Sequence, residues 1–516
     1  MVVMARAASR LRGGAAHHVR RLAHHPSAVP LLAAILLVLI GTQIALVFKV
    51  PSWGNDEPAH VGYVASLAEG RLPTIETNIV DDPARFPGTA GEFRGWDEEH
   101  GDIWTANHPP LFHLAMVPAW WVASDHQTAM IITMRLANTL GFAVWLYLVG
   151  AVARELVPRR PAVSALAVVV AAAPTMVLRS AFFVNDGWAA ASALLLFLMT
   201  VRMLRGRVTS PLLITAVVAG IVAAGTRAQG VLAVAVCASA LLVVISRRDG
   251  WHRGVGVFAA VGGIPAAAVS WFYLRNLRLY GDLTGQDALL DKFDRSPVTG
   301  LDQIDDIPGL AEPALATGIA LAAALVLVPV FLVRWVQRHG WRLDAAWALL
   351  VIHALVTAQN VVAFLAIGGG FHDRYLMQIM PVLATATALG MLEVGRWWSR
   401  ARLDPAAADR RDWWTASGWS ALLLVWLAGA VAWLEHHYVF SRQTSSPVDG
   451  LLPDALVVLA LGAGAALLAV MVGQARAGSR LSRDGGRQPG SGGDPVDALA
   501  GAPGRQEHED ECRCQQ

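Results

Sequence analysis

The sequence is poor in cysteine and in charge for a chain of 516 residues. Its three cysteines, Cys237 in an apolar run and Cys512 and Cys514 near the end, exclude an outward-facing disulfide framework. Charged residues make up only 16% of the chain and hydrophobic residues 55%, which argues against a string of soluble domains. The net charge of +2 carries little information, and we expect no nucleic-acid partner. No internal repeat is visible.

What the sequence does contain is a series of apolar runs, each of about 20 residues and therefore long enough to cross a bilayer. These runs predict an all-α polytopic membrane protein with about twelve transmembrane helices and a large first extracytoplasmic loop that carries juxtamembrane helices. The predicted spans are 29–50, 130–153, 162–179, 186–204, 211–226, 229–246, 255–274, 313–336, 344–366, 374–394, 414–434 and 452–474.

The positions of the basic residues predict how these spans are oriented. With the N-terminus in the cytoplasm, 28 of the 41 Lys and Arg residues lie in inner segments. We therefore expect a multi-pass protein of the cytoplasmic (inner) membrane with both termini cytoplasmic. The expected parts are a basic N-terminus (1–28), a transmembrane module with outer loops 51–129 and 275–312 (29–394), C-terminal transmembrane helices (395–474) and a disordered cytoplasmic tail (475–516).

The segment 108–122 is apolar but short, and Pro109, Pro110 and Pro118 interrupt it. Counting it as a span would invert every later loop and place the Arg clusters outside. We therefore interpret it as a re-entrant or interfacial segment.

The stretch that follows the first span contains the strongest candidate for chemistry. Asp56 and Glu57 are adjacent, and His60 follows at helical spacing, so a helix would place His60 on the same side as the two acids. Such a group could bind a divalent metal ion or remove a proton. An ordinary helix start is the alternative, because Asp56 can cap a helix and Pro58 suits an early helical position.

Further polar residues gather where other spans reach the outer side. They are Arg179, Asn185, Asp186, Arg227, Arg275, Asn276 and the segment from His372 to Tyr375. Arginines bind phosphate oxygens bidentately, and carboxylates can act as a general base on a hydroxyl. Together with a lipid environment, this composition suggests a lipid-phosphate donor whose head group is transferred. Simpler roles stay open. The side chains of Arg275 and Arg374 could serve merely to reach the lipid head groups, and Asp186 could serve merely to cap a helix.

Six motifs give the chain a resemblance to a known family. They are DEPAHVGYVASLAEGRLP (56–73), NHPPLFHL (107–114), RLAN (135–138), FVND (183–186), WFYLRNLRLYGD (271–282) and HDRYLMQIMP (372–381). In this order they resemble the polyprenyl-phosphate-dependent glycosyltransferases of the C-type fold, in particular the family 39-like protein mannosyltransferases and the lipid A aminoarabinose transferases.

The resemblance implies roles for individual residues. An acid of the first outer loop is the catalytic base or a metal ligand in that family, which corresponds to Asp56 with Glu57 beside it, and Asp186 takes the place of a second acid. His108, directly before the paired prolines, would contact the donor phosphate. The late outer loop from His372 to Tyr375 would lie near the lipid head group.

The sequence therefore predicts a membrane glycosyltransferase of the cell envelope. It would move a hexose or pentose from a polyprenyl-phosphate donor to a hydroxyl of an envelope glycan, lipid or protein. The transfer would invert the anomeric carbon and take place at the extracytoplasmic face. Membrane lipids would surround the protein. A transporter or flippase for a lipid-linked or anionic solute is the alternative.

The predicted site comprises three sets of residues. The catalytic set is Asp56, Glu57 and Asp186. The substrate-binding set is His60, His108, Arg179, Arg227, Arg275, Asn276, His372, Asp373, Arg374 and Tyr375. A site for Mg²⁺ or Mn²⁺, if the reaction uses one, would be built from Asp56, Glu57 and His60.

Overall fold

A computed structural model gives the fold. It describes residues 25, 27–48, 56–78, 102–123, 126–295, 297, 326–337, 344–370, 373–397, 405–436, 448 and 450–484. Across these ranges the regular structure is helical, apart from one isolated β-bridge between Asn78 and Asp102. The predicted all-α class is confirmed.

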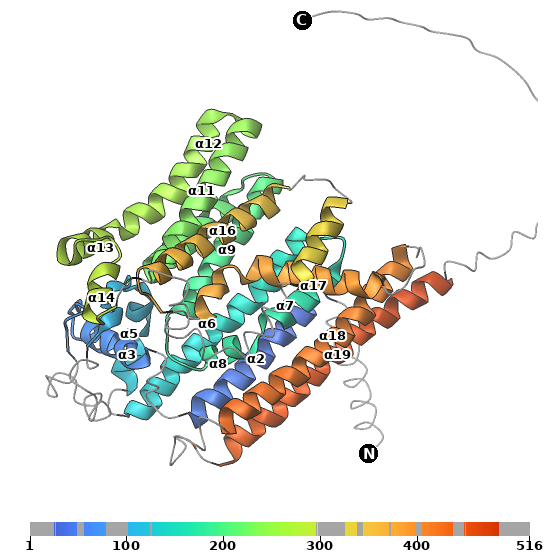
Figure 1. Cartoon of the computed structure of the whole chain (residues 1–516), viewed down its shortest axis with the longest axis horizontal. Helices are drawn as coiled ribbons and strands as arrows, with labels where there is room; N and C mark the ends of the chain where they lie inside the picture. Colours follow the sequence, from blue (N-terminus) through green and yellow to red (C-terminus); the bar gives the residue numbers. More distant parts are fainter. Residues whose placement is uncertain are drawn as a thin grey trace, which may run out of the picture.

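The helices follow one another along the whole described chain (Figure 1). In order they are α2 (Ala28–Val47), α3 (Glu57–Ala68), the 3-10 turn η3 (Trp104–Asn107), α5 (Leu111–Ala123), α6 (Gln127–Leu156), α7 (Pro161–Ala171), α8 (Pro174–Ser180), α9 (Asp186–Arg205), α10 (Ser210–Thr226), α11 (Ala228–Asp249), α12 (Trp251–Phe258), the π-turn η4 (Ala259–Gly263), α13 (Ile264–Tyr280), α14 (Gln286–Lys292), α16 (Ala345–Ala366), the 3-10 turn η6 (Asp373–Gln378), α17 (Met380–Trp397), α18 (Pro405–Glu435) and α19 (Leu451–Asp484).

Eight helices within the described residues are long and apolar enough to cross a membrane, and α7 with α8 makes a ninth if the pair counts as one span. The chain is thus a polytopic membrane protein, but the predicted count of twelve spans is not confirmed. Helix α10 and the helix Val326–Gln337 are apolar but shorter than the eight. The part of the predicted span 313–336 before residue 326 lies outside the described residues.

The predicted span 162–179 is broken rather than straight, because α7 and α8 meet at an angle of 66°. Proline explains the break, since Pro174 has no backbone N–H to donate and disfavours a helical conformation in the residue before it. Ala173 accordingly has extended backbone angles, with φ −57° and ψ 145°. The bend sends the short helix α8, with Arg179 in its last turn, in a new direction.

Helix α5 is too short to cross a membrane. Its 13 residues correspond to about 20 Å of helix, against a hydrocarbon core of about 30 Å. This length agrees with the expectation of an interfacial or re-entrant segment at 108–122.

The helices differ in how much of their surface other helices cover. In α9, 83% of the apolar window is buried, whereas in α19 the share is 17%, although α19 is the more apolar of the two. Helix α9 is therefore central, and the long pair α18 and α19 lies at the edge of the assembly beside α2 (Figure 1). Exposed apolar faces of this kind are expected toward lipid.

Ion pairs connect several helices at the end of the bundle that lies opposite α3, η3 and α5. Arg160 at the start of α7 contacts Asp412 of α18 at 2.8 Å and Glu393 of α17 at 3.0 Å. Arg202 near the end of α9 contacts Glu155 near the end of α6 at 2.9 Å. These groups lie in predicted inner segments or at the inner ends of predicted spans, so the structure brings the predicted inner helix ends together. We call the other side, where α3, η3 and α5 lie, the α3 end.

The last helix extends beyond its predicted end at residue 474 and reaches Asp484. The rest of the predicted tail, 485–516, and the first 24 residues of the predicted N-terminal segment lie outside the described residues.

Candidate functional site

Asp56 lies at the entrance to α3 in an unusual backbone conformation. Its φ of 59° is in the left-handed region, which costs a residue other than glycine about 1–2 kcal/mol. Its side chain makes no capping hydrogen bond, so the simple helix-start interpretation does not describe it. Instead, Oδ1 accepts a hydrogen bond from the indole Nε1 of Trp104 at 3.4 Å, and Oδ2 contacts Nη1 of Arg374 at 2.6 Å.

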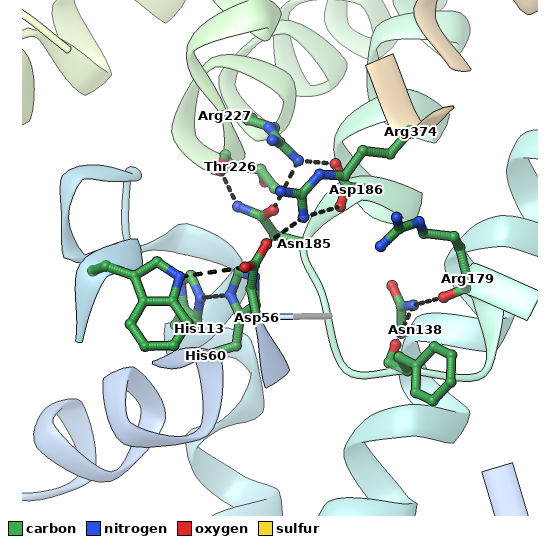
Figure 2. Close-up of polar contacts among 12 residues, drawn as sticks. Asp56, His60, His113, Asn138, Arg179, Asn185, Asp186, Thr226, Arg227 and Arg374 are labelled. Carbon is green, nitrogen blue, oxygen red and sulfur yellow. Dashed lines mark hydrogen bonds and ion pairs between the residues drawn. The ribbon is translucent and has the colours of Figure 1, made fainter. Parts of the chain in front are cut away.

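Arg374 joins Asp56 to a second carboxylate, that of Asp186. Its Nη1 lies 3.7 Å from Oδ2 of Asp186, which occupies the first turn of α9. Asp186 is also ion-paired with Arg227, at the turn between α10 and α11. Figure 2 shows these four side chains directed toward one another. Residues from four distant parts of the chain therefore meet at the α3 end.

Asn185 fixes the position of Arg227 relative to the start of α9. Its amide oxygen lies 3.4 Å from Nη1 of Arg227, and its amide nitrogen donates to the carbonyl oxygen of Thr226 at 3.0 Å. The contact ties the α8–α9 connection to the α10–α11 turn (Figure 2). Asn185 and Thr226 thus hold the ion-paired cluster in place without adding charge.

The cluster carries more positive than negative charge. Arg179, on the last turn of α8, points toward the same group in Figure 2. Three guanidinium groups therefore face two carboxylates, Asp56 and Asp186. The side chains of Arg227, Arg374 and Asp186 are each less than 10% exposed, so water screens this surplus weakly. Such a site favours an anionic ligand, and arginine is suited to phosphate.

Glu57 has contacts different from those that its neighbour in the sequence makes. Both of its carboxylate oxygens accept from Arg135 of α6, each at 2.7 Å, and neither side chain is exposed. Oε1 also accepts from the backbone N–H of Phe183 at 2.9 Å. Arg135 in turn donates to the carbonyl oxygens of Ala45 and Phe48, each at 3.0 Å. This buried clamp holds α2, α3, α6 and the α8–α9 connection together directly beside Asp56.

The predicted metal site is not assembled in the part of the chain that the structure describes. No group of three or more His, Cys, Asp or Glu side chains there could hold a metal ion. Glu57 uses both oxygens on Arg135, and Asp56 faces Trp104 and Arg374. The residues Asp56, Glu57 and His60 therefore do not fit a shared cation, and we derive no step through one.

His60 belongs to a stack of rings beneath Asp56. Its Nδ1 lies 2.9 Å from Nε2 of His113, and its ring stacks on those of His113 and His108 at centroid distances of 5.2 and 6.5 Å. Tyr63 stacks on His113 at a centroid distance of 4.1 Å and donates to the backbone carbonyl oxygen of His108 at 2.9 Å. Burial is the main cause that lowers the pKa of His60 and of His108. His108 is thus neutral near pH 7, so it can donate a hydrogen bond but supplies no positive charge.

This stack makes the stability of the protein sensitive to acid. In the unfolded chain the histidines take up protons near pH 6.5, whereas burial lowers the pKa of His60, His108 and His113 in the folded protein. We therefore expect the free energy of unfolding to fall as the pH decreases from about 7 to 5. The thermal unfolding midpoint in detergent, measured across this range, should change less steeply for His113→Gln than for the wild type. The exposed His126 provides a control, because His126→Asn should keep the wild-type slope, and an equal slope in all three proteins would contradict this account.

The structure places two predicted substrate-binding residues in supporting positions. Arg275 donates to the carbonyl oxygen of Pro73 at 2.6 Å and so holds the segment that follows α3. Asn276 is fully buried and donates to the carbonyl oxygen of Asn107 at 3.0 Å. Neither of these contacts reaches the ion-paired cluster, so both residues shape the surrounding loop.

The late predicted segment is described only in part. His372 and the side chain of Asp373 lie outside the described residues. Tyr375 packs edge-on against Phe364 of α16, with ring centroids 5.9 Å apart, and the guanidinium carbon of Arg374 lies 5.9 Å from the Tyr375 ring. The Tyr375 ring thus lies within cation–π distance of Arg374.

The predicted site did not include several residues of this region, and three of them make direct contacts with predicted residues. Trp104 contacts Asp56, Arg135 holds Glu57, and His113 pairs with His60. Arg135 could have been found from the sequence, because a charged residue inside a predicted span needs a buried partner. The other two lie in segments whose placement depends on tertiary packing.

Comparisons with known proteins give three findings. The family described as "Predicted membrane protein (DUF2142)" matches residues 91–288, a segment that contains Asp186 and Arg227 but not Asp56. The curated proteins contain no match. The chain has a limited structural similarity to ArnT from Cupriavidus metallidurans bound to undecaprenyl phosphate, with 16% identity, a TM-score of 0.45, and coverage of 88% of this chain and 78% of that one.

Two further solved structures are similar to the same degree. The archaeal oligosaccharyltransferase AglB from Archaeoglobus fulgidus, in complex with an inhibitory peptide and a dolichol-phosphate, has 12% identity, a TM-score of 0.47, and coverage of 81% and 56%. The arabinosyltransferase EmbB from Mycobacterium smegmatis has 13% identity, a TM-score of 0.42, and coverage of 92% and 45%. The chain thus spans about half the length of these two proteins.

Proposed function

We propose that this protein is a membrane glycosyltransferase that moves a sugar from a polyprenyl-phosphate donor to an acceptor hydroxyl at the extracytoplasmic face, with inversion at the anomeric carbon. One observation carries the proposal. A single guanidinium group, that of Arg374, contacts the carboxylates of both Asp56 and Asp186 in a mostly buried site at the helix ends.

The residues of the cluster match the needs of such a reaction. Asp56 is the more exposed of the two carboxylates and would take the proton from the acceptor hydroxyl as its oxygen attacks the anomeric carbon. The bond from that carbon to the phosphate oxygen breaks, and the lipid phosphate leaves with increased negative charge. Arg374, Arg227 and Arg179 supply positive charge where this anion develops, which lowers the barrier most effectively in a site shielded from water.

The location of the cluster argues for transfer rather than transport. Asp56, Asp186, Arg227 and Arg374 all lie at helix ends or in turns. Transporters typically hold their substrate near the middle of the membrane on discontinuous helices and are often built from two repeated halves. The break between α7 and α8 is a discontinuity, but Arg179 lies at the far end of α8 from it.

The test is turnover without a gradient. Purified protein in detergent is incubated with a polyprenyl-phosphate sugar and envelope-derived acceptors, and mass spectrometry follows release of the polyprenyl phosphate. We expect release together with a glycosylated acceptor. Movement of intact lipid across liposomes, with no turnover in detergent, would instead identify a flippase.

The proposal predicts that Arg374 recognises the lipid phosphate. Loss of hydrogen bonds to a charged group costs about 1.5–3 kcal/mol, so Arg374→Gln should weaken the binding of polyprenyl phosphate about 10- to 150-fold. Arg374→Lys should recover part of the affinity, because lysine keeps the charge but not the forked geometry. Binding is measured directly with the polyprenyl phosphate. The control is Arg278→Gln, on an exposed position of α13, and similar losses in the two Gln variants would exclude specific recognition by Arg374.

A further inference from the structure

An aromatic pair lies beside Asp56, in which Trp104 contacts the carboxylate and Phe293 packs against Trp104. The indole of Trp104 donates to Oδ1 of Asp56 at 3.4 Å, and the ring of Phe293 packs against the indole at a centroid distance of 6.1 Å and an interplanar angle of 79°. Both side chains are half-buried. Arg374 contacts the other oxygen of Asp56, Oδ2. The two oxygens of Asp56 therefore face two different surfaces, one aromatic and one cationic. We call the pair Trp104 and Phe293 the aromatic wall.

Buried polar contacts hold the turn that carries Trp104. The side chain of Asn107, in the same turn η3, donates to the carbonyl oxygen of Thr284 at 3.1 Å. The backbone carbonyl oxygen of Asn107 accepts from the side chain of Asn276 at 3.0 Å. The turn is therefore tied both to α13 and to the connection between α13 and α14.

The segment that carries Phe293 is fixed to the same region. Lys292, its neighbour, contacts Asp102 at 2.5 Å and Glu76 at 2.9 Å, and Asp102 forms the β-bridge with Asn78. The two rings thus come from segments about 190 positions apart that are joined by ion pairs and hydrogen bonds. A surface that is built before the ligand arrives loses little entropy on binding.

The chemistry of the wall suits a sugar ring. The face of an indole is electron-rich, and the C–H groups on one face of a pyranose or furanose are weakly positive and apolar, so the two surfaces pack together. Carbohydrate sites commonly add polar groups at the edge of such a ring, and the Asp56 carboxylate lies at the edge of Trp104.

The order of the groups around Asp56 indicates whether the donor sugar or the acceptor would bind at the aromatic wall. In an inverting transfer, the attacking hydroxyl and the leaving phosphate lie on opposite sides of the anomeric carbon. The leaving phosphate belongs beside Arg374, on the Oδ2 side of Asp56. The acceptor hydroxyl belongs beside Oδ1, where the wall lies.

From this arrangement we infer that the aromatic wall binds the acceptor, and that the acceptor is itself a carbohydrate rather than a peptide or a lipid hydroxyl. The inference rests on the proposed function and specifies its acceptor. The acceptor O–H proton passes to the Asp56 carboxylate, the new bond forms between the acceptor oxygen and the anomeric carbon, and the polyprenyl phosphate leaves with the electron pair of the broken bond.

The first test compares acceptors with the full-length protein in detergent. A synthetic oligosaccharide with a short alkyl chain, a serine- and threonine-containing peptide and a diacylglycerol are each offered with a polyprenyl-phosphate sugar. Transfer to the oligosaccharide is expected. Preferential transfer to the peptide or to the lipid would overturn the inference while leaving the proposed function intact. If the wild-type protein consumes no donor with any of the three acceptors or with water, that result would instead contradict the proposed function.

The second test uses the wall itself. Trp104→Ala should raise KM for the oligosaccharide at least tenfold and leave the dissociation constant for polyprenyl phosphate unchanged. Trp104→Phe keeps a ring face and should recover most of the affinity, which also separates a binding role from simple misfolding. Trp121→Ala on α5, with an indole that is 65% exposed, is the matched control and should behave as the wild type. An unchanged KM in Trp104→Ala, or an equal loss of affinity for the lipid phosphate, would refute the assignment.

Discussion

Asp56→Asn is expected to abolish sugar transfer while the protein stays folded, inserted and able to bind polyprenyl phosphate. An amide cannot accept the proton of the acceptor hydroxyl, and loss of a general base typically slows a reaction by about two to four orders of magnitude. The single oxygen of the amide can still accept from Arg374, but its NH2 group then faces the indole N–H of Trp104, so that hydrogen bond is lost while the other contact is kept. Single-turnover release of polyprenyl phosphate is the appropriate measurement.

Glu69→Gln supplies the matched control, since Glu69 follows the same helix α3 and pairs with Arg71 at the surface. That variant should turn over at the wild-type rate. Near-normal turnover in Asp56→Asn would remove Asp56 from the mechanism, whereas equal inactivation of both variants would indicate damage to the loop as a whole.

The second large effect concerns stability. Removing one partner of a buried ion pair leaves an uncompensated charge and costs about 3–5 kcal/mol. Glu57→Ala and Arg135→Ala should therefore each lower the free energy of unfolding by about that amount, because neither side chain is exposed. The thermal unfolding midpoint in detergent reports the change. Arg71→Ala, at the exposed pair with Glu69, should cost at most about 1 kcal/mol.

A double substitution tests whether Glu57 and Arg135 stabilise the protein as a charge pair or independently of each other. Glu57→Gln with Arg135→Gln removes both charges and keeps an acceptor near the N–H of Phe183. Its unfolding midpoint should lie above that of either single Gln variant, since the cost of an unpaired buried charge disappears. Additive losses would show that the two residues contribute independently.

We propose on this basis that Glu57 acts through Asp56. The clamp fixes the residue next to one that has a left-handed backbone, and strained conformations persist only where their surroundings hold them. The sequence indicated that both acids were important but could not separate their roles. Glu57 is the first residue of α3 and contacts Arg135 of α6, whereas Asp56 precedes the helix with a left-handed backbone and contacts Arg374 of η6.

The gathering of polar groups at one end could be predicted because it depends only on the alternation of spans. Once Asp56, Asp186 and Arg227 are assigned to ends of the same side, they must lie on one face of the membrane domain. Their contacts could not be predicted, since those depend on how the helices pack. Arg275 and Arg374 looked equivalent in the sequence, yet Arg275 binds the backbone at Pro73 and Arg374 binds Asp56.

The number of spans was harder to predict for a similar reason. Hydropathy measures how apolar a segment is and not whether it bends. The sequence therefore predicts one span at 162–179, although Pro174 divides it. The end of α19 was placed at residue 474 because the apolar run stops near there, but helical hydrogen bonding continues to Asp484 through a polar sequence.

Cross-linking tests the central claim, that Asp56 and Arg374 meet at one site, most directly. Cys237, Cys512 and Cys514 are first replaced, and cysteines are then introduced at Asp56 and Arg374. A short bifunctional thiol reagent should join the two positions within one chain, and mass spectrometry should identify the linked peptides. A second pair, at Asp56 and Arg396, should give no link, because Arg396 pairs with Asp412 at the opposite helix ends. Failure to link Asp56 with Arg374, or equal linking in the control pair, would contradict the account.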